Sequence, residues 1–172
     1  MSLLYAKGHS GLTFFIMSLI MMILPYSENG LIVIVLSASL SALPDLDLKW
    51  QRQGIPIQHR GPTHSILAAI ITGVAFGALF WYAYNTIVWT AIGFTAGFMG
   101  VVSHLIGDSF THHAFKPLWP FSDREIALHW TNASNKAVND GLATLGISTF
   151  MIYFLNGNGV LRDLMQIFLN IS

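Results

Sequence analysis

The sequence predicts an all-α, polytopic membrane protein with about five short transmembrane helices. Hydrophobic residues make up 53% of the 172 residues and charged residues only 9%, whereas soluble domains carry roughly 25% charged residues. So few charges cannot cover a soluble surface. The length favours a single domain over residues 1–172, because a second core would need apolar surface that the membrane spans already use.

Apolar stretches provide the predicted spans, in the order 12–24, 31–43, 65–84, 87–106 and 142–155. A bilayer core needs roughly 20 helical residues. The third and fourth stretches are therefore long enough, and the other three are short unless their polar flanks also lie in the helix. In the last segment, Val160–Ile171, Arg162 and Asp163 lie among apolar residues, which favours a helix in the membrane interface.

Positive charges fall on one side of the predicted membrane. When the spans are threaded alternately through the bilayer, that side receives Lys7, Lys49, Arg52, Arg60, Lys116, Arg124 and Lys136. The opposite connections, residues 26–30, 85–86 and 156–159, contain no Lys or Arg. By the positive-inside rule the charged side faces the cytoplasm. Aromatic residues expected to anchor the same side at the interface are Trp119, Phe121 and Trp130.

Charge balance and residue types exclude several classes of site. Eight Lys and Arg residues balance eight Asp and Glu residues, so the chain lacks the broad basic field of a nucleic-acid-binding domain and no direct nucleic-acid partner is expected. The sequence has no cysteine. Any metal ion must therefore be held by His, Asp or Glu.

Two carboxylates follow the second span in Pro44-Asp45-Leu46-Asp47. Proline ends a helix, which leaves Asp45 and Asp47 at its mouth on the charged side. Carboxylates this close repel one another unless a cation lies between them. The structural alternative is helix capping, or pairing with Lys49 and Arg52.

Two histidines flank a Gly-Pro step in the segment HRGPTHS, residues 59–65, which opens the third span. The positive end of the helix dipole favours the neutral, metal-binding form of His64 and attracts an anion. Arg60 presents a planar fork suited to phosphate oxygens. Alternatively, His64 caps the helix and Arg60 binds lipid headgroups structurally.

His104 and Asp108 lie four residues apart near the end of the fourth span, so they share one helical face. Both could hold one metal ion, or they could form a supporting hydrogen bond. His112 and His113 are adjacent and cannot both point inward, so at most one is expected to be a ligand. His129 is expected on the surface.

These motifs resemble the YdjM-like family of LexA-regulated inner-membrane proteins that are classed as metal-dependent hydrolases. The resemblance is carried, in the family's order, by Gly8-His9, Pro44-Asp45-x-Asp47, HRGPTHS, Ser103-His104-Leu105-x-x-Asp108-x-x-Thr111 and Pro117-Leu118-Trp119-Pro120. It implies a helical hydrolase of the bacterial inner membrane with a role in the DNA-damage response.

A fainter likeness is to the zinc-dependent phospholipase C and P1 nuclease group. Asp45, His59 and the His104/Asp108 pair could play the parts of that group's Asp, His and His-x3-Asp elements. The sequence has no clear second His-x3-Glu element, so a three-metal site is not expected.

The sequence therefore predicts a membrane-bound, metal-dependent hydrolase of a phosphoester on a lipid or other amphiphilic substrate. One or two divalent ions, most plausibly zinc, would be held by His9, Asp45, Asp47, His59, His64, His104 and Asp108. Metal-activated water would attack the phosphoryl group, with Asp47 as proton acceptor and Arg60 stabilising the developing charge.

The alternative is a non-catalytic membrane protein that uses the same cluster for ion or proton movement or for metal-stabilised folding. A third hypothesis is a partner protein in a stress response. Membrane lipids are expected partners in every case. A homo-oligomer is an open alternative, because small residues permit close helix contacts either within one chain or between chains. These small residues are Gly73, Gly77, Gly93, Gly97 and Gly100.

Overall fold

A computed structural model describes residues 3–56 and 59–171 of the chain. This part of the chain is helical with connecting loops and contains no β-strand, as the sequence predicts. In chain order the elements are α1 (Leu3–Met22), α2 (Glu28–Leu40), α3 (Leu46–Arg52), the 3-10 turn η1 (Pro62–His64), α4 (Ile66–Tyr84), α5 (Ile87–Ser109), α6 (Lys136–Gly157) and α7 (Val160–Ile171).

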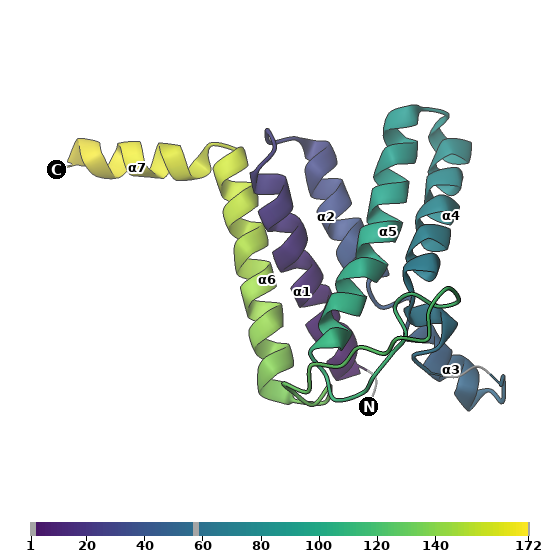
Figure 1. Cartoon of the computed structure of the whole chain (residues 1–172). Coiled ribbons are helices and arrows are strands. Elements are labelled where there is room, and N and C mark those ends of the chain that lie inside the picture. The colour runs from purple at the N-terminus through teal and green to yellow at the C-terminus, as the bar shows by residue number, and fades with distance from the viewer. Residues whose placement is uncertain (1–2, 57–58, 172) are drawn as a thin grey trace.

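The long helices stand side by side in the order α6, α1, α2, α5, α4 (Figure 1). The α1–α2, α4–α5 and α6–α7 connections lie at one end of this bundle. The short helix α3, the turn η1 and the long loop between α5 and α6 lie at the other end, beside the start of α1. All the motif segments singled out in the sequence thus come to one end, which we call the motif end.

Three helices, α4, α5 and α6, are long and apolar enough to cross a membrane, whereas α2 is a shorter apolar helix of 13 residues. Their outer faces carry exposed apolar side chains such as Ile71, Leu79 and Ile147, which suits contact with lipid. Five crossings remain a prediction, since helix length and composition support three.

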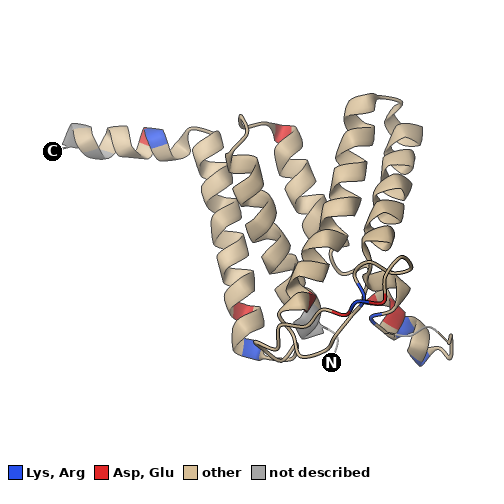
Figure 2. Cartoon of the chain, in the orientation of Figure 1, with Lys and Arg blue, Asp and Glu red and all other residues tan. Residues whose placement is uncertain are grey.

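Charged side chains gather at the motif end of the bundle (Figure 2). Every Lys and Arg except Arg162, which lies in α7, belongs to that end. The long loop there also carries exposed Trp119, Phe121 and Trp130. The predicted sidedness of charge is therefore present in the fold, while its cytoplasmic orientation and the anchoring role of these aromatic residues remain predictions.

Helix α7 leaves the opposite end and runs crosswise to the bundle (Figure 1). Its bounds match the predicted segment, and Leu164, Met165 and Ile167 on it are exposed. Its placement in the membrane interface remains a prediction.

Glycines bring neighbouring helices of the same chain into contact. A Cβ on Gly97 would lie 2.7 Å from the carbonyl oxygen of Thr72, and one on Gly93 would lie 2.5 Å from that of Phe76. These contacts join α4 to α5, so the small residues there serve packing within the chain. Association between copies of the chain remains a prediction.

Helix α1 begins at Leu3, well before the apolar stretch predicted to start at residue 12, and α6 begins at Lys136 rather than near residue 142. The polar flanks belong to these helices because α1 and α6 touch there. A Cβ on Gly11 would overlap the backbone of Ala143, and one on Gly146 would overlap the carbonyl of Gly11. Apolar run length alone does not reveal such a contact.

Polar caps fix where the helices start. Ser65 accepts a hydrogen bond from the Ala68 N–H at the start of α4, and Asn135 does the same for Val138 in α6. Such caps are worth about 0.5–2 kcal/mol. Because α4 starts directly after Ser65, His64 is held in the turn η1 at the mouth of the bundle.

The half of the bundle away from the motif end has an apolar core. Met17, Ile34, Ile92 and Tyr153 are buried together there. These side chains come from α1, α2, α5 and α6, so they fill the space between the helices beyond the site described below.

We expect Gly146→Ala to lower stability by about 1–3 kcal/mol, because the new methyl group must displace the backbone of α1. Gly141→Ala on the same helix is the matched control: nothing lies within 4 Å of its added Cβ, and alanine favours helix by up to about 1 kcal/mol. Thermal unfolding in detergent measures both. Equal unfolding temperatures would contradict the close α1–α6 contact.

Candidate metal centre

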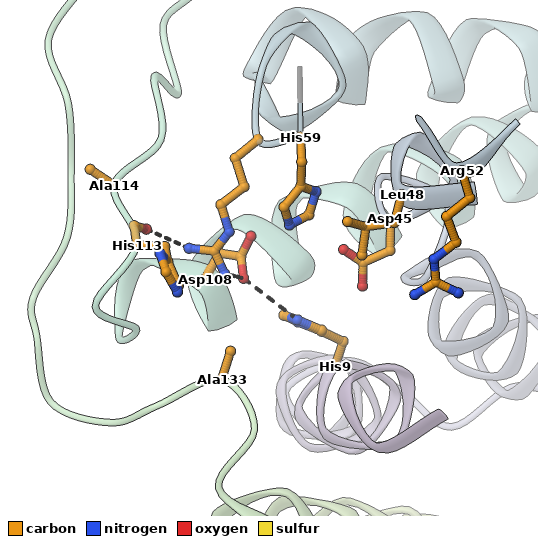
Figure 3. A pocket seen from close by; sticks show the side chains of 10 residues that line it. His9, Asp45, Leu48, Arg52, His59, Asp108, His113, Ala114 and Ala133 are labelled. Atoms are coloured by element: carbon orange, nitrogen blue, oxygen red, sulfur yellow. Dashed lines mark hydrogen bonds and ion pairs between the residues drawn. The ribbon is translucent and has the colours of Figure 1, made fainter. Parts of the chain in front are cut away.

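The predicted site residues come from four segments and meet at the motif end. His9 lies on α1, Asp45 and Asp47 lie at the start of α3, His59 and His64 lie in the segment before α4, and His104 and Asp108 lie near the end of α5. Figure 3 shows His9, Asp45, His59 and Asp108 around one pocket. The structure brings all seven predicted metal residues together.

Four side-chain atoms converge most closely. His64 Nε2 lies 3.1 Å from His104 Nε2. Asp108 Oδ2 lies 3.3 Å from the first and 3.5 Å from the second, and Asp45 Oδ1 lies 3.7 Å from each. Ligand atoms around a tetrahedral zinc ion are about 3.3–3.5 Å apart, given metal–ligand bonds of about 2.0–2.2 Å. The atoms of His64, His104 and Asp108 therefore have the spacing of a metal's ligand shell, and these three residues form one group that could hold a metal ion.

Hydrogen bonds to the outer ring nitrogens orient both imidazoles. The Nδ1 of His104 lies 2.8 Å from the Ser41 carbonyl, which can only accept, so Nδ1 carries the proton. Thr63 donates to Asp47 at 2.8 Å, which leaves its oxygen to accept from His64 Nδ1 at 3.0 Å. In the neutral rings, both Nε2 lone pairs thus face one another. Such a pair requires a cation between them, either a proton or a metal ion.

Asp108 gives an independent sign of a missing partner. Its side chain is 2% exposed, and Oδ2 makes no hydrogen bond to any described residue. A buried carboxylate oxygen without a hydrogen-bond donor is costly, and native structures rarely keep one without a ligand, ion or water.

Protons and metal ions compete for this cluster. Burial lowers the pKa of His64, but the nearby carboxylates of Asp45, Asp47 and Asp108 outweigh burial and raise that pKa to about 9. Burial raises the pKa of Asp47, but hydrogen bonds with His59, His64 and Thr63 hold it well below its usual value. The carboxylates therefore stay ionised and attract a cation, and a metal ion displaces the proton on His64.

Asp47 does not fit the roles of metal ligand and proton acceptor that the sequence predicted. It is fully buried. One oxygen lies 2.8 Å from His59 Nδ1, and the other accepts from the Arg60 N–H at 3.2 Å and from Thr63 at 2.8 Å. With both oxygens occupied, Asp47 positions the histidines that surround it.

His9 lacks the hydrogen bond to its second ring nitrogen that His64 and His104 have. Its ring stacks on His104 with centroids 3.9 Å apart, and its Nε2 lies 3.6 Å from Asp108 Oδ1. Its Nδ1 is buried without a hydrogen bond to any described residue. Metal-binding histidines almost always pair their second nitrogen, so His9 is less well prepared as a ligand.

His59 occupies the edge of the cluster. Its Nδ1 donates to Asp47, which leaves Nε2 unprotonated in the neutral ring. Its side chain is 30% exposed, and one of its nitrogens lies within 4.8 Å of ligand atoms on Asp45 and His64. His59 is thus open to the pocket, whereas His64 and His104 are fully buried.

Arg60 joins the segments that enclose the cluster. Its NH2 group donates to Asp108 Oδ1 at 2.7 Å, and its NH1 group donates to Thr111 at 2.8 Å and to the His113 carbonyl. Its backbone has a φ of 60°, in the left-handed region. That conformation turns the backbone N–H to Asp47 and the side chain to Asp108, so one residue holds both sides of the site.

A cavity of about 440 Å³ opens above these atoms (Figure 3). His9, Asp45, His59, Arg60 and Asp108 line it, together with Leu48, Arg52, His113, Ala114 and Ala133. Sequence reasoning missed Arg52 as a cavity residue and considered it only as an alternative pairing partner of Asp45 and Asp47. The helical spacing Leu48 to Arg52, which puts both on one face of α3, was the available signal.

The remaining histidines lie outside the cluster. His112 is exposed and its Nδ1 bonds the Thr131 carbonyl at 2.7 Å, while His113 lines the cavity. His129 is exposed beside His112, as expected. Among the described residues, none of the three belongs to a group that could hold a metal ion.

Comparison with known proteins gives one match. A family model described as YdjM inner membrane protein matches residues 4–169. No curated protein and no solved structure matches the chain. The likeness to the phospholipase C and P1 nuclease group therefore receives no support.

We expect Arg60→Gln to lower stability by about 1.5–3 kcal/mol, because hydrogen bonds to a charged group are lost and Asp108 is left without its cation. Arg52→Gln is the control, since Arg52 lines the same cavity without an ion pair to a described residue; its effect should stay within about 0.5 kcal/mol. Chemical unfolding of the metal-free protein measures both. If the two variants unfold alike, Arg60 does not hold the site together.

Proposed function

We propose that this chain, which belongs to the YdjM inner membrane protein family, is a membrane-bound, metal-dependent hydrolase of phosphoesters. The observation that carries the proposal is the pair of imidazole Nε2 atoms 3.1 Å apart beside the unpartnered Oδ2 of Asp108, a residue that also lines an open cavity. Buried, hydrogen-bonded ligands beneath a cavity are the arrangement that metal-dependent hydrolysis needs.

His64, His104 and Asp108, which form one group of possible metal ligands, would hold the ion, which we expect to be zinc. Three protein ligands leave the fourth position of a catalytic zinc site for water. Such an ion lowers the pKa of a water ligand to about 7 and polarises a phosphoryl oxygen. A second ion on Asp45, His59 and His64 is not part of the proposal, because the free Nε2 of His59 is needed as the base.

His59 is the proton acceptor in this proposal. Asp47 holds its Nδ1–H, which directs the basic Nε2 toward the pocket. When the water oxygen bonds to phosphorus and the P–O bond to the leaving alcohol breaks, Nε2 takes the water's proton and can return it to the leaving oxygen. Asp47 acts through His59 by fixing its orientation.

Arg60 would contribute positive charge at the cavity wall. Two of its nitrogens already hold Asp108, Thr111 and the His113 carbonyl, whereas its Nε–H makes no hydrogen bond to a described residue. Its main role is therefore to position Asp108, and its charge favours the developing negative charge on the phosphoryl group.

A substrate at the membrane surface suits the position of the cavity. The cavity lies at the motif end, where the apolar helices α4, α5 and α6 meet a loop with exposed Phe121 and Trp130. Aromatic residues favour the boundary between lipid and water. A lipid or other amphiphilic phosphoester could reach the cavity from this boundary, on the cytoplasmic side of the bacterial inner membrane by the positive-inside rule.

The rival hypothesis is non-catalytic ion binding or transport by the same cluster. Transport needs a polar path to the other side of the membrane. Beyond the site, the bundle combines the apolar core of Met17, Ile34, Ile92 and Tyr153 with buried hydroxyls such as Ser18 and Ser37. No carboxylate or imidazole of the described residues is buried there, which favours a pocket that ends at the metal centre.

The test uses the full chain purified in detergent. Metal content is measured first, and release of phosphate from an aryl phosphate and from a phospholipid is then measured with and without a chelator. The proposal expects bound metal and turnover that chelation abolishes. Bound metal without turnover on any phosphoester would favour the non-catalytic rival.

We expect His64→Ala and Asp108→Ala to lose bound zinc, because each removes one of three protein ligands, and to lose turnover with it. His112→Ala, which removes an exposed histidine outside the cluster, is the control and should keep both. Zinc per chain is measured by mass spectrometry. Full zinc content in both ligand variants would remove the ligand assignment.

We expect His59→Ala to keep its zinc and to lose about 10²–10⁴-fold in turnover, the usual contribution of a general base. Added imidazole should restore part of that activity, because the cavity is open where the ring is removed. Loss of zinc in this variant would make His59 a ligand. Activity unchanged from the native protein would exclude the role in proton transfer.

A further inference from the structure

We propose that Arg52 binds the phosphate group of the substrate, and that the cavity selects phosphate monoesters over diesters. This inference rests on the proposed function, since it concerns the substrate of the same site. The geometry points to it through an unpaired cation on a cavity whose floor holds metal-binding groups.

Arg52 is the unpaired cation of the cavity. Arg60, the other cation that lines the cavity, is paired with Asp108. Lys49 and Arg124 also have no ion pair with a described residue, but neither lines the cavity. Arg52 forms no ion pair with a described Asp or Glu, although Asp45 and Asp108 line the same cavity. Figure 3 draws Arg52 among the side chains that line the pocket.

Helix α3 explains why Arg52 reaches the cavity. Asp47, near the start of α3, is buried and held by His59, Arg60 and Thr63. This anchors the helix, and Leu48, one turn before Arg52, faces the same cavity. Arg52 thus stands on an element that the metal centre itself fixes.

The charges around the cavity favour an anion once a divalent ion is bound. Three carboxylates, Asp45, Asp47 and Asp108, contribute three negative charges, and the two arginines contribute two positive ones. A divalent ion adds two more, so the sum becomes positive. The remaining lining residues are neutral or histidine. An anionic group in the cavity would therefore meet no uncompensated carboxylate.

A phosphate monoester fits this arrangement better than a diester. It has three non-ester oxygens and up to two negative charges, so one part of the group can face the metal ligands while another accepts the planar fork of Arg52. A diester has two such oxygens and one charge. Losing Arg52 should therefore weaken monoester binding far more than diester binding.

The first experiment measures binding without turnover, on the zinc-loaded full chain in detergent with inorganic phosphate as the probe. We expect Arg52→Gln to keep its zinc and to weaken phosphate binding at least 10-fold, with Arg52→Lys between Gln and the native protein. Lys49→Gln, on the same helix but outside the cavity lining, is the control and should bind as the native protein does. Equal phosphate affinity in Arg52→Gln and the native protein would overturn the proposal.

The second experiment compares substrates. We expect Arg52→Gln to raise KM at least 10-fold for a soluble aryl phosphate and for phosphatidic acid in vesicles, while kcat changes less than 3-fold. For the diester bis-aryl phosphate, KM should change less than 3-fold. An equal rise for both ester classes would overturn the selectivity. A rise confined to vesicles would overturn the phosphate site in favour of contact with the membrane surface.

Failure of the proposed function would look different. Arg52-dependent phosphate binding without turnover of any ester would support the anion site and contradict the hydrolase. A chain that binds neither zinc nor phosphate would contradict both.

Discussion

The site depends on one electrostatic constraint, which is the meeting of two imidazole nitrogens and a carboxylate oxygen in a buried space. When both rings are neutral, His64 and His104 donate their Nδ1–H groups to other partners, and their Nε2 atoms then face each other 3.1 Å apart with no proton between them. Asp108 Oδ2 lies beside them without a hydrogen bond to a described residue. A cation satisfies all three at once, and the surrounding fold keeps these atoms in place.

Packing at glycine contacts and hydrogen bonds at helix starts hold this arrangement. His104 is carried by α5, which packs on α4 through Gly93 and Gly97, while the Ser65 cap fixes where α4 begins and hence where His64 lies. Arg60 then joins the segment before α4 to the loop after α5. Substitutions well away from the metal centre can therefore disturb it by moving a helix rather than a ligand.

Much of the site was predictable from the sequence because its residues fall on one side of a threaded membrane chain. His59, His64, His104 and Asp108 needed only that threading. The division of labour among them was not predictable, since Asp47 is removed from direct chemistry by contacts with His59, Arg60 and Thr63 that only coordinates reveal. The start of α1 at Leu3 could not be fixed from the sequence for a related reason. The contact of Gly11 with α6, which lies in the polar part of the helix, is visible only in the coordinates.

The apolar core beyond the metal centre also has a consequence for how substrate and products enter and leave the cavity. Met17, Ile34, Ile92 and Tyr153 fill the bundle on that side, whereas the cavity and two smaller pockets that share lining residues with it lie at the motif end. Under the proposed reaction, the lipid alcohol that is released would return to the bilayer, and the phosphate anion would diffuse into water. Each turnover would then wait for the exit of the slower fragment before a new molecule could dock.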